Sequence, residues 1–179
     1  YYLTINNINP IALKRKNMWL KKVQTIFLNH GDKNSTLFNK IRWKELDLLD
    51  FYNTGKALKN IDIVFHSAAM VSFNTQMKDQ LLATNYLATK NLINFSLIHN
   101  VSKFCFISSV ATLSKNINQI VFDEESWFSW SETKSNYAIS KYLAEMEVWR
   151  GFAEGLNGFI VNPSLIIGPG DQNGLFKTM

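Results

Sequence analysis

The stretch Phe104-Cys105-Phe106-Ile107-Ser108-Ser109 decides the fold of this sequence. Four consecutive apolar residues are typical of a parallel strand buried inside an α/β protein, and the two serines mark its carboxyl end. Open α/β sheets bind their ligands outside the carboxyl ends of the strands, where a hydroxyl can hydrogen-bond a substrate oxygen. The sequence therefore predicts an α/β fold with a parallel sheet and one candidate catalytic serine, Ser109.

The second part of the predicted site is Tyr137-Ala-Ile-Ser-Lys141, which lies on a helical pattern. A phenol and an ammonium group at positions i and i+4 share one face of a helix. The nearby cation stabilises the ionised phenolate, so Tyr137 is a candidate acid/base and Lys141 its partner. The same spacing recurs at Tyr52/Lys56 and Tyr86/Lys90. Only Tyr137 follows a strand-end serine, whereas Tyr52 stands beside Thr54-Gly55, a pair that predicts a helix break.

These residues resemble the core of a known family, the extended short-chain dehydrogenase/reductases, also called the NAD-dependent epimerase/dehydratase family. The resemblance rests on Ser109 with Tyr137-x-x-x-Lys141 and extends over nearly all of the chain. The runs Phe106–Thr112 and Asn162–Gly170 are more similar to the dihydroflavonol reductase and 3β-hydroxysteroid dehydrogenase branch than to the sugar-nucleotide epimerases. The resemblance implies a Rossmann-like doubly wound parallel sheet, an NAD or NADP cofactor and a small-molecule substrate, and it is compatible with a homodimer.

Composition favours one globular domain. With 179 residues, of which 46% are hydrophobic, the chain can bury one sizeable core, so we expect one domain. The resemblance implies that residues 1–179 form part of an NAD(P)-binding domain. No apolar run approaches the roughly 18 residues of a transmembrane helix and no secretory signal opens the chain, so we expect no membrane association. The single cysteine, Cys105, excludes an internal disulfide and favours a reducing, cytoplasmic location.

The net charge of +5 raises the question of a nucleic-acid partner. The basic residues are spread along the chain, with short clusters at Lys14–Lys16 and Lys21–Lys22 and no nucleic-acid-binding motif. We therefore expect no nucleic acid and favour a phosphate-bearing cofactor. The three histidines, His30, His66 and His99, lack metal-ligand spacing, so no metal site is expected and His66 is predicted to be structural.

Arg15 lies where the predicted strand 10–14 ends. In a Rossmann fold this position meets the adenosine ribose, and arginine suits a 2′-phosphate where an acidic residue would bind the free 2′-hydroxyl. NADP is therefore favoured over NAD, and a solvated basic turn remains the open alternative. The resemblance implies that Asp47 and Leu48 contact the adenine, and Asp50 is a helix N-cap candidate.

Two further segments are expected to contact the cofactor. Ser67, Ala68 and Ala69 follow the predicted buried strand 61–65, and their small side chains let a diphosphate or ribose approach the backbone. The resemblance implies that the backbone near Pro163 holds the nicotinamide carboxamide.

Asn85 interrupts the apolar side of a long predicted helix, residues 76–100. A buried amide must be hydrogen-bonded. The run Asn85-Tyr-Leu-Ala-Thr89 is similar to the family's Asn-x-x-Gly-Thr motif, whose asparagine helps to order the active site, with Ala88 in place of the glycine. Asn85 is therefore grouped with the candidate catalytic residues.

The sequence contains no glycine-rich phosphate loop, because its eight glycines include no G-x-G-x-x-G cluster. Residues 1–7 are predicted to end a helix, so we expect the chain to begin inside the first crossover helix, without the first strand and its turn. We expect it to end before most of the carboxyl-terminal substrate-binding region. In the family's strand order, 3-2-1-4-5-6, the missing strand then separates strands 10–14 and 61–65. Alone, this stretch is expected to bind NADP weakly and to lack measurable dehydrogenase activity.

The predicted reaction is hydride transfer between a nicotinamide and a carbonyl or alcohol substrate. Tyr137 transfers the proton, Ser109 polarises the substrate oxygen, and Lys141 binds the ribose and acts on Tyr137. Two alternatives stay open: a nucleotide-sugar epimerase or dehydratase with retained cofactor, and a non-catalytic NAD(P)-sensing protein. The polar segment 113–135, which carries two tryptophans, either lines a substrate mouth or packs on the domain.

Overall fold

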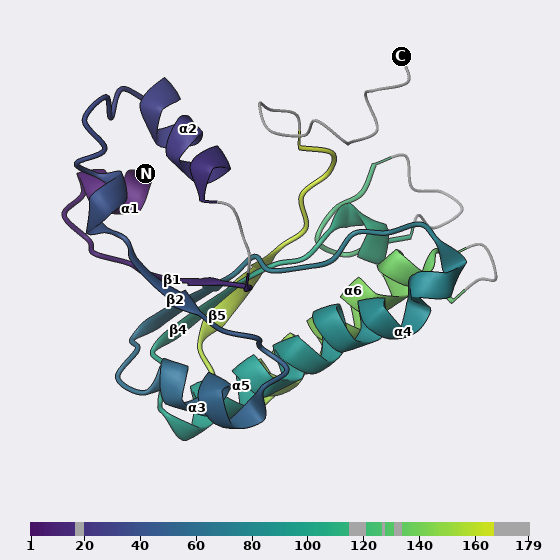
Figure 1. The fold of residues 1–179 in the computed structure, drawn as a ribbon. Coiled ribbons are helices and arrows are strands. Elements are labelled where there is room, and N and C mark those ends of the chain that lie inside the picture. The colour runs from purple at the N-terminus through teal and green to yellow at the C-terminus, as the bar shows by residue number, and fades with distance from the viewer. Residues whose placement is uncertain (17–19, 115–120, 127, 131–133, 167–179) are drawn as a thin grey trace, which may run out of the picture. The chain divides into compact units, whose positions relative to one another are not determined.

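The computed structural model describes residues 1–16, 20–114, 121–126, 128–130 and 134–166 (Figure 1). The chain divides into two compact units, one of residues 1–47 with 166–179 and one of residues 48–165, and each is described by itself. Trp127, one of the two tryptophans of segment 113–135, and the sequence Gly168-Pro-Gly170 lie outside the described residues.

The first unit contains two parallel strands and short helices. Its elements are α1 (Tyr2–Ile5), β1 (Ile11–Lys14), α2 (Lys21–Asn29), the 3₁₀ turn η1 (Phe38–Lys40) and β2 (Arg42–Glu45). Strand β1 pairs with β2 from Ile11 opposite Arg42 to Lys14 opposite Glu45. Helix α2 ends before Gly31, whose φ of +94° favours glycine. The predicted strand 10–14 is confirmed as β1.

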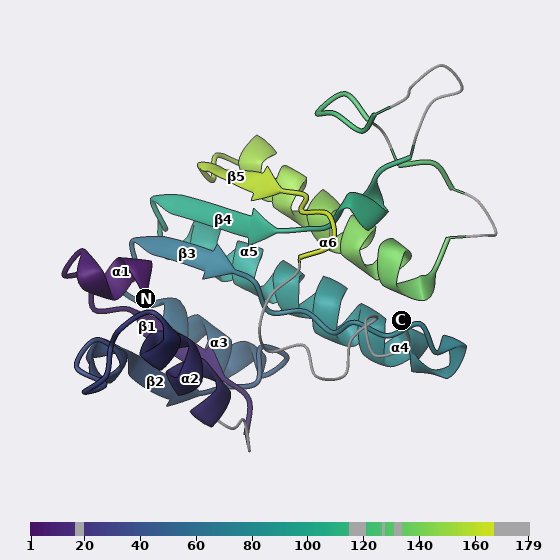
Figure 2. The same ribbon diagram turned by 90° about the horizontal axis from the view of Figure 1, so that it is seen from above.

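The second unit contains three parallel strands and the longer helices (Figure 2). Its elements are α3 (Phe51–Leu58), β3 (Ile63–His66), η2 (Thr75–Met77), α4 (Lys78–Leu81), the π-helical turn η3 (Leu82–Leu87), α5 (Ala88–Ile98), β4 (Lys103–Ile107), η4 (Val110–Thr112), α6 (Asn136–Ala153) and β5 (Gly158–Val161). Phe104 on the central strand β4 lies between Val64 on β3 and Gly158 on β5. The expected parallel strand that ends at the two serines is confirmed.

The strand pairing agrees with the predicted topology. Among the described residues, the strands form two sheets, β1-β2 and β3-β4-β5. In the predicted order, one further strand separates strand 10–14 from strand 61–65, so these two strands are not expected to pair. An α/β fold with parallel sheets is therefore established for both units.

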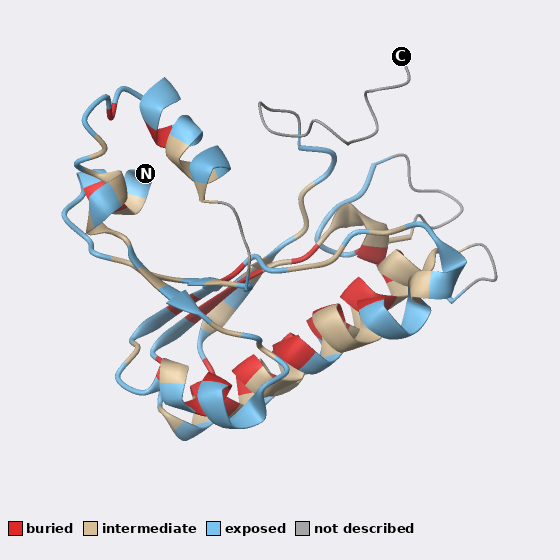
Figure 3. Cartoon of the chain, viewed as in Figure 1, coloured by how far each residue is buried: buried red, intermediate tan, exposed pale blue. Residues whose placement is uncertain are grey.

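The core of the second unit lies between its sheet and the helices α3, α5 and α6 (Figure 3). The buried apolar side chains of this core are Leu58, Val64, Leu92, Ile93, Phe95, Val101, Phe104, Phe106, Ala144, Val148 and Leu156. Full burial of a side chain of the size of Leu or Phe contributes about 1.5 to 3 kcal/mol. Packing of Phe104 and Phe106 therefore helps to fix β4 against the helices.

Strand β3 is buried on one side only. Val64 and His66 are buried, whereas Ile63 and Phe65 are 51% and 58% exposed. The prediction of a strand buried on both faces is wrong for this unit taken by itself, because its helices cover one face of the sheet. An apolar run cannot show which face a helix covers.

Gly55 lies inside helix α3, which continues through Thr54-Gly55. The predicted helix break at this pair is therefore wrong. A Cβ atom on Gly55 would approach Phe95 Cε1 to 2.6 Å, so the glycine lets the Phe95 ring of α5 contact the backbone of α3. The residue is needed for close packing rather than for a turn. Asp50 caps this helix as expected, since its carboxylate accepts from Asn53 N at 3.0 Å.

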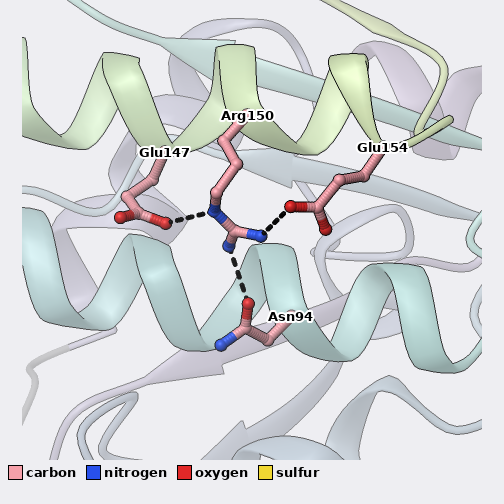
Figure 4. Close-up of polar contacts among 4 residues, drawn as sticks. All are labelled: Asn94, Glu147, Arg150 and Glu154. Carbon is pink, nitrogen blue, oxygen red and sulfur yellow. Dashed lines mark hydrogen bonds and ion pairs between the residues drawn. The ribbon is translucent and has the colours of Figure 1, made fainter.

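A group of polar side chains joins α5 to α6 at their surface (Figure 4). The guanidinium of Arg150 contacts Glu147 Oε2 at 2.8 Å and Glu154 Oε1 at 2.8 Å, both on α6 or its end. It also donates to Asn94 Oδ1 on α5 at 2.7 Å. Exposed ion pairs of this kind contribute little, about 0 to 1 kcal/mol each, so these residues serve below as controls for buried ones.

Candidate active site

Lys141 is buried at the carboxyl end of β4. It lies on α6, is 2% exposed, and its Nζ donates to Ile107 O at 2.7 Å while lying 4.3 Å from the Phe106 ring centroid. Burial lowers the pKa of Lys141 to about 8, and the negative charge of Glu145 acts in the opposite direction. The amine is thus held at the carbonyl oxygen of Ile107, two residues before Ser109 in the chain.

Ser109 forms the turn that follows β4. It is the N-cap of η4, and its Oγ accepts from Ala111 N at 3.2 Å. Val110 N donates to Pro163 O at 3.0 Å, which joins this turn to the segment after β5. Ser109 and Pro163, both predicted site residues, therefore lie in adjacent segments at the carboxyl ends of neighbouring strands.

Tyr137 is the second residue of α6, one helical turn before Lys141. Ser135 caps this helix by accepting from Ala138 N at 3.1 Å, which fixes where the helix begins. The Tyr137 ring is half-buried and makes an edge contact with Phe73, at a centroid distance of 6.3 Å. Phe73 itself is 66% exposed, so an open aromatic surface adjoins the phenol.

The two other Tyr-x-x-x-Lys pairs have a different environment. Lys56 Nζ lies 4.2 Å from the Tyr52 ring centroid and Lys90 Nζ lies 5.9 Å from the Tyr86 ring centroid. In both pairs the lysine covers its own tyrosine on a helix surface, as in an ordinary cation–π contact. Lys141 instead extends to the strand end, so the structure distinguishes this pair from the two others.

Asn85 joins two parts of the candidate site. Its Oδ1 accepts from Met70 N at 2.7 Å, and its Nδ2 donates to Met70 O at 2.9 Å and to Ser140 Oγ at 2.9 Å. Met70 directly follows the predicted cofactor segment Ser67–Ala69, and Ser140 precedes Lys141. Asn85 lies in the π-helical turn η3, an irregularity often found at functional sites. Its amide atoms therefore connect the segment after β3 to α6.

His66 is a neutral, buried residue beneath this connection. Its Nε2 lies 2.8 Å from Thr89 Oγ1, and Thr89 Oγ1 lies 2.6 Å from Asn85 O. Because a carbonyl only accepts, Thr89 donates to Asn85 O and accepts from His66, which places the imidazole proton on Nε2. Burial, with a smaller effect of the Lys141 charge, lowers the pKa of His66 to about 3. This agrees with the structural role predicted for His66.

A buried carboxylate, absent from the predicted site, lies behind the serine turn. Glu145 Oε2 accepts from Ser108 Oγ at 2.5 Å, from Thr112 Oγ1 at 3.0 Å and from Asn162 Nδ2 at 3.0 Å. One sequence signal could have indicated it, because Glu145 follows Lys141 at i+4 and so shares the helix face of Tyr137 and Lys141. Its partners, 17 to 37 residues away in sequence, carry no such signal.

The remaining predicted cofactor residues lie in both units. In the second unit, Ser67 and Ala68 are exposed after β3, Ala69 is half-buried, and Leu48 packs against the core. In the first unit, Arg15 is exposed directly after β1 and Asp47 is exposed after β2. The structure describes these two groups separately, and their assignment to a cofactor stays a prediction.

Aromatic side chains fix part of the segment 113–135 on α6. Phe128 stacks on Tyr142 with a centroid distance of 3.9 Å, and Trp130 makes an edge contact with Tyr142 at 5.7 Å. Lys134 Nζ donates to Leu113 O at 2.9 Å. Trp130 is nevertheless 63% exposed, so it combines packing with an open ring face.

The described ranges contain neither a membrane-spanning helix nor a cluster of metal ligands. In that part of the chain, no helix is both long and apolar enough to cross a membrane. The same residues hold no cluster of three or more His, Cys, Asp or Glu side chains that could bind a metal ion.

The parallel α/β fold, with a Ser and a Tyr-x-x-x-Lys pair at its strand ends, defines a class: Rossmann-like nucleotide-binding proteins. A family profile agrees with this class. The profile of the NAD-binding family described as male sterility protein matches residues 49–179. The chain belongs to this family, and thereby to the extended short-chain dehydrogenase/reductases, related to cinnamoyl-CoA reductases, dihydroflavonol reductases and 3β-hydroxysteroid dehydrogenases.

Individual relatives match over part of the chain. Cinnamoyl-CoA reductase 1 of Petunia hybrida is 32% identical over 130 residues, covering 69% of this chain and 38% of the relative. A sterol-4-alpha-carboxylate 3-dehydrogenase (decarboxylating) of Dictyostelium discoideum is 38% identical over 73 residues, covering 38% of this chain and 22% of the relative. This chain thus spans less than two fifths of these curated relatives.

A solved structure confirms the fold. The UDP-N-acetylglucosamine 4-epimerase of Methanobrevibacter ruminantium, in complex with UDP-N-acetylmuramic acid, superposes with a TM-score of 0.76 at 24% identity. The match covers 98% of this chain and 53% of the epimerase. At this identity the similarity establishes a Rossmann-like fold and nothing about the substrate.

Proposed function

We propose that the protein is an NAD(P)-dependent oxidoreductase that transfers a hydride between nicotinamide and a carbonyl or alcohol substrate. The reduced or oxidised nicotinamide, when bound, supplies or accepts the hydride. In carbonyl reduction, Tyr137 donates its proton to the substrate oxygen, which Ser109 hydrogen-bonds, and in alcohol oxidation the proton returns to Tyr137. Lys141 stabilises the ionised form of Tyr137 and donates to the nicotinamide ribose, while Asn85 keeps the surrounding segments in place.

One observation carries this proposal: Lys141 is a buried amine fixed at the end of the strand that precedes Ser109. Burying an ammonium group is costly unless its environment or its function requires it. A lysine needed only for packing would extend its amine to solvent, as lysine side chains usually do. The buried amine instead donates to Ile107 O at the end of β4, and Tyr137 precedes Lys141 by one turn of α6, which supports a role for the amine toward both the phenol and a ribose.

The residues of this chain suit a nicotinamide nucleotide. The small side chains of Ser67 and Ala68 are exposed after β3, which leaves the backbone accessible to a phosphate or ribose. Pro163 O already accepts from Val110 N, so the segment that we assign to the carboxamide is held next to the serine turn. NADP is favoured over NAD on the basis of the exposed Arg15, whose guanidinium suits a 2′-phosphate.

The test uses the protein expressed from its complete reading frame. Initial rates of NADPH and NADH oxidation are measured with aldehydes, ketones and CoA thioesters, the last because a relative is named a cinnamoyl-CoA reductase. Tyr137→Phe should lower kcat at least about 100-fold, the usual range for losing a general acid. Tyr52→Phe is the matched control, since it removes the hydroxyl of a surface Tyr-x-x-x-Lys pair, and should leave kcat unchanged. Unaltered turnover in Tyr137→Phe would contradict the proposal.

Retention of the cofactor on purification and the presence of turnover together separate the alternatives. An epimerase or dehydratase should be purified with nicotinamide that resists dialysis, whereas a reductase exchanges cofactor freely. A sensing protein should bind cofactor without turnover in any of these reactions.

We further propose a small-molecule substrate, no nucleic-acid partner and a reducing cytoplasmic location. The location is supported by the free, buried Cys105. A homodimer is supported by the half-exposed Trp149 on α6, and light scattering tests it.

A further inference from the structure

Glu145 is a buried carboxylate one helical turn beyond Lys141. It is 8% exposed, and three side-chain groups converge on the same oxygen, Oε2, at 2.5 to 3.0 Å. An isolated buried charge is strongly unfavourable, whereas one that accepts several hydrogen bonds is tolerated. The arrangement of donors therefore compensates for the burial of the carboxylate.

The three donors come from the segments that form the serine turn and its neighbour. Ser108 directly follows β4, Thr112 ends η4, and Asn162 follows β5. The Thr112 hydroxyl and Asn162 Nδ2 also lie 2.8 Å and 3.3 Å from Ser109 O. The single hydroxyl hydrogen of Thr112 serves either the carboxylate or this carbonyl. The carboxylate is thus the common acceptor that joins α6 to both segments around Ser109.

Glu145 also affects the charge of Lys141. The groups that interact with the Lys141 amine are Ile107 O and the Phe106 ring from β4, His66 from β3, and Glu145 from α6. His66 is neutral, so Glu145 supplies the negative charge that opposes the effect of burial on the lysine. Loss of that charge should make Lys141 release its proton at lower pH.

We propose that Glu145 is a positioning residue: its carboxylate holds the turn of Ser109 against α6 and places a negative charge one helical turn from Lys141. The inference rests on the proposed function for the identity of the reaction. The placement of Glu145 is independent of that function. Glu145 contacts Ser108, Thr112 and Asn162 and acts through Ser109 and Lys141.

The first test measures the charge effect without turnover. The complete protein is labelled with ¹³C in its lysine side chains, the Lys141 signal is assigned with Lys141→Arg, and its pKa is followed by NMR. In Glu145→Gln, which keeps the size of the side chain, the pKa of Lys141 should fall by about one unit or more. Glu147→Gln, on the same helix but paired with Arg150 at the surface, should leave it unchanged. An unchanged Lys141 titration in Glu145→Gln would overturn the inference.

The second test measures catalysis. Glu145→Gln should lower kcat about 10- to 100-fold, because small displacements of reacting groups have effects of this size. KM for the nucleotide should change little, and the alkaline limb of the kcat/KM profile for reduction should move to lower pH. A merely structural residue would change the thermal midpoint and not the pH profile. Equal kcat and an equal profile in an active protein would also refute the inference.

A milder variant covers the case in which Glu145→Gln does not fold. Ser108→Ala leaves the carboxylate in place and removes one of its three donors, so it should lower kcat several-fold with an unchanged pKa of Lys141. Wild-type kcat in Ser108→Ala would then overturn the positioning role. A wild-type protein without turnover would contradict the proposed function alone, because the comparison of the Lys141 titration between wild type and Glu145→Gln needs no turnover.

Discussion

Replacing Asn85 with alanine should destabilise the protein by about 2 to 4 kcal/mol. The substitution removes three hydrogen bonds of 2.7 to 2.9 Å, two to the backbone of Met70 and one to Ser140. Each neutral hydrogen bond contributes about 0.5 to 1.5 kcal/mol, and a buried group that loses its partner costs about 1 to 3 kcal/mol. Asn85 is 2% exposed, so water cannot replace the amide without entering the core. A loss of this size is large against a typical stability of about 5 to 15 kcal/mol.

Urea unfolding followed by circular dichroism measures this loss. Asn94→Ala is the control on the neighbouring helix α5: Asn94 also accepts a hydrogen bond, from Arg150 at 2.7 Å, but this bond is only partly buried (Figure 4). Arg150 keeps both of its glutamate partners in this control, so the cost should stay below about 1 kcal/mol. Equal destabilisation by the two alanine variants would refute the reasoning, because burial would then not decide the effect.

Two further predictions concern stability. Gly55→Ala should destabilise the protein by about 1 to 3 kcal/mol in the same urea assay, because the new methyl group overlaps the Phe95 ring. Helix propensity alone predicts that alanine would stabilise α3. A stabilised variant would therefore show that the Phe95 ring moves freely. The pKa of His66 in the folded state, about 3, lies below its ordinary value of 6.5, so the unfolded state binds more protons between these pH values and stability falls as pH decreases through this window. The expected slope is up to about 1.4 kcal/mol per pH unit, and His66→Gln should flatten it; an equal slope in that variant would assign the pH dependence to other groups.

Much of the candidate site followed from local sequence patterns. The run that ends in Ser108-Ser109 specified strand β4 with both of its ends, and the spacing of Tyr137 and Lys141 placed them on one helix. Asp50 was predicted as an N-cap, and Asn85 was expected to be hydrogen-bonded because it interrupts an apolar face. These features depend on the backbone periodicity and on the chemistry of a few consecutive residues, which a sequence displays directly.

Tertiary packing alone decided the other features. Gly55 predicted a helix break, yet it lies inside α3 because the Phe95 ring of another helix needs the space. Ile63 and Phe65 were expected to be buried, and they are exposed because the helices of this unit cover the opposite face of the sheet.

The polar groups of the candidate site show the same division. The sequence determined that a serine ends β4 and that Tyr137 and Lys141 share a face of α6. It did not show that Glu145 accepts from Ser108, Thr112 and Asn162, which lie on separate segments. Which polar groups lose water, and which partners they then require, depends on contacts between elements distant in sequence, and these form only when the elements pack.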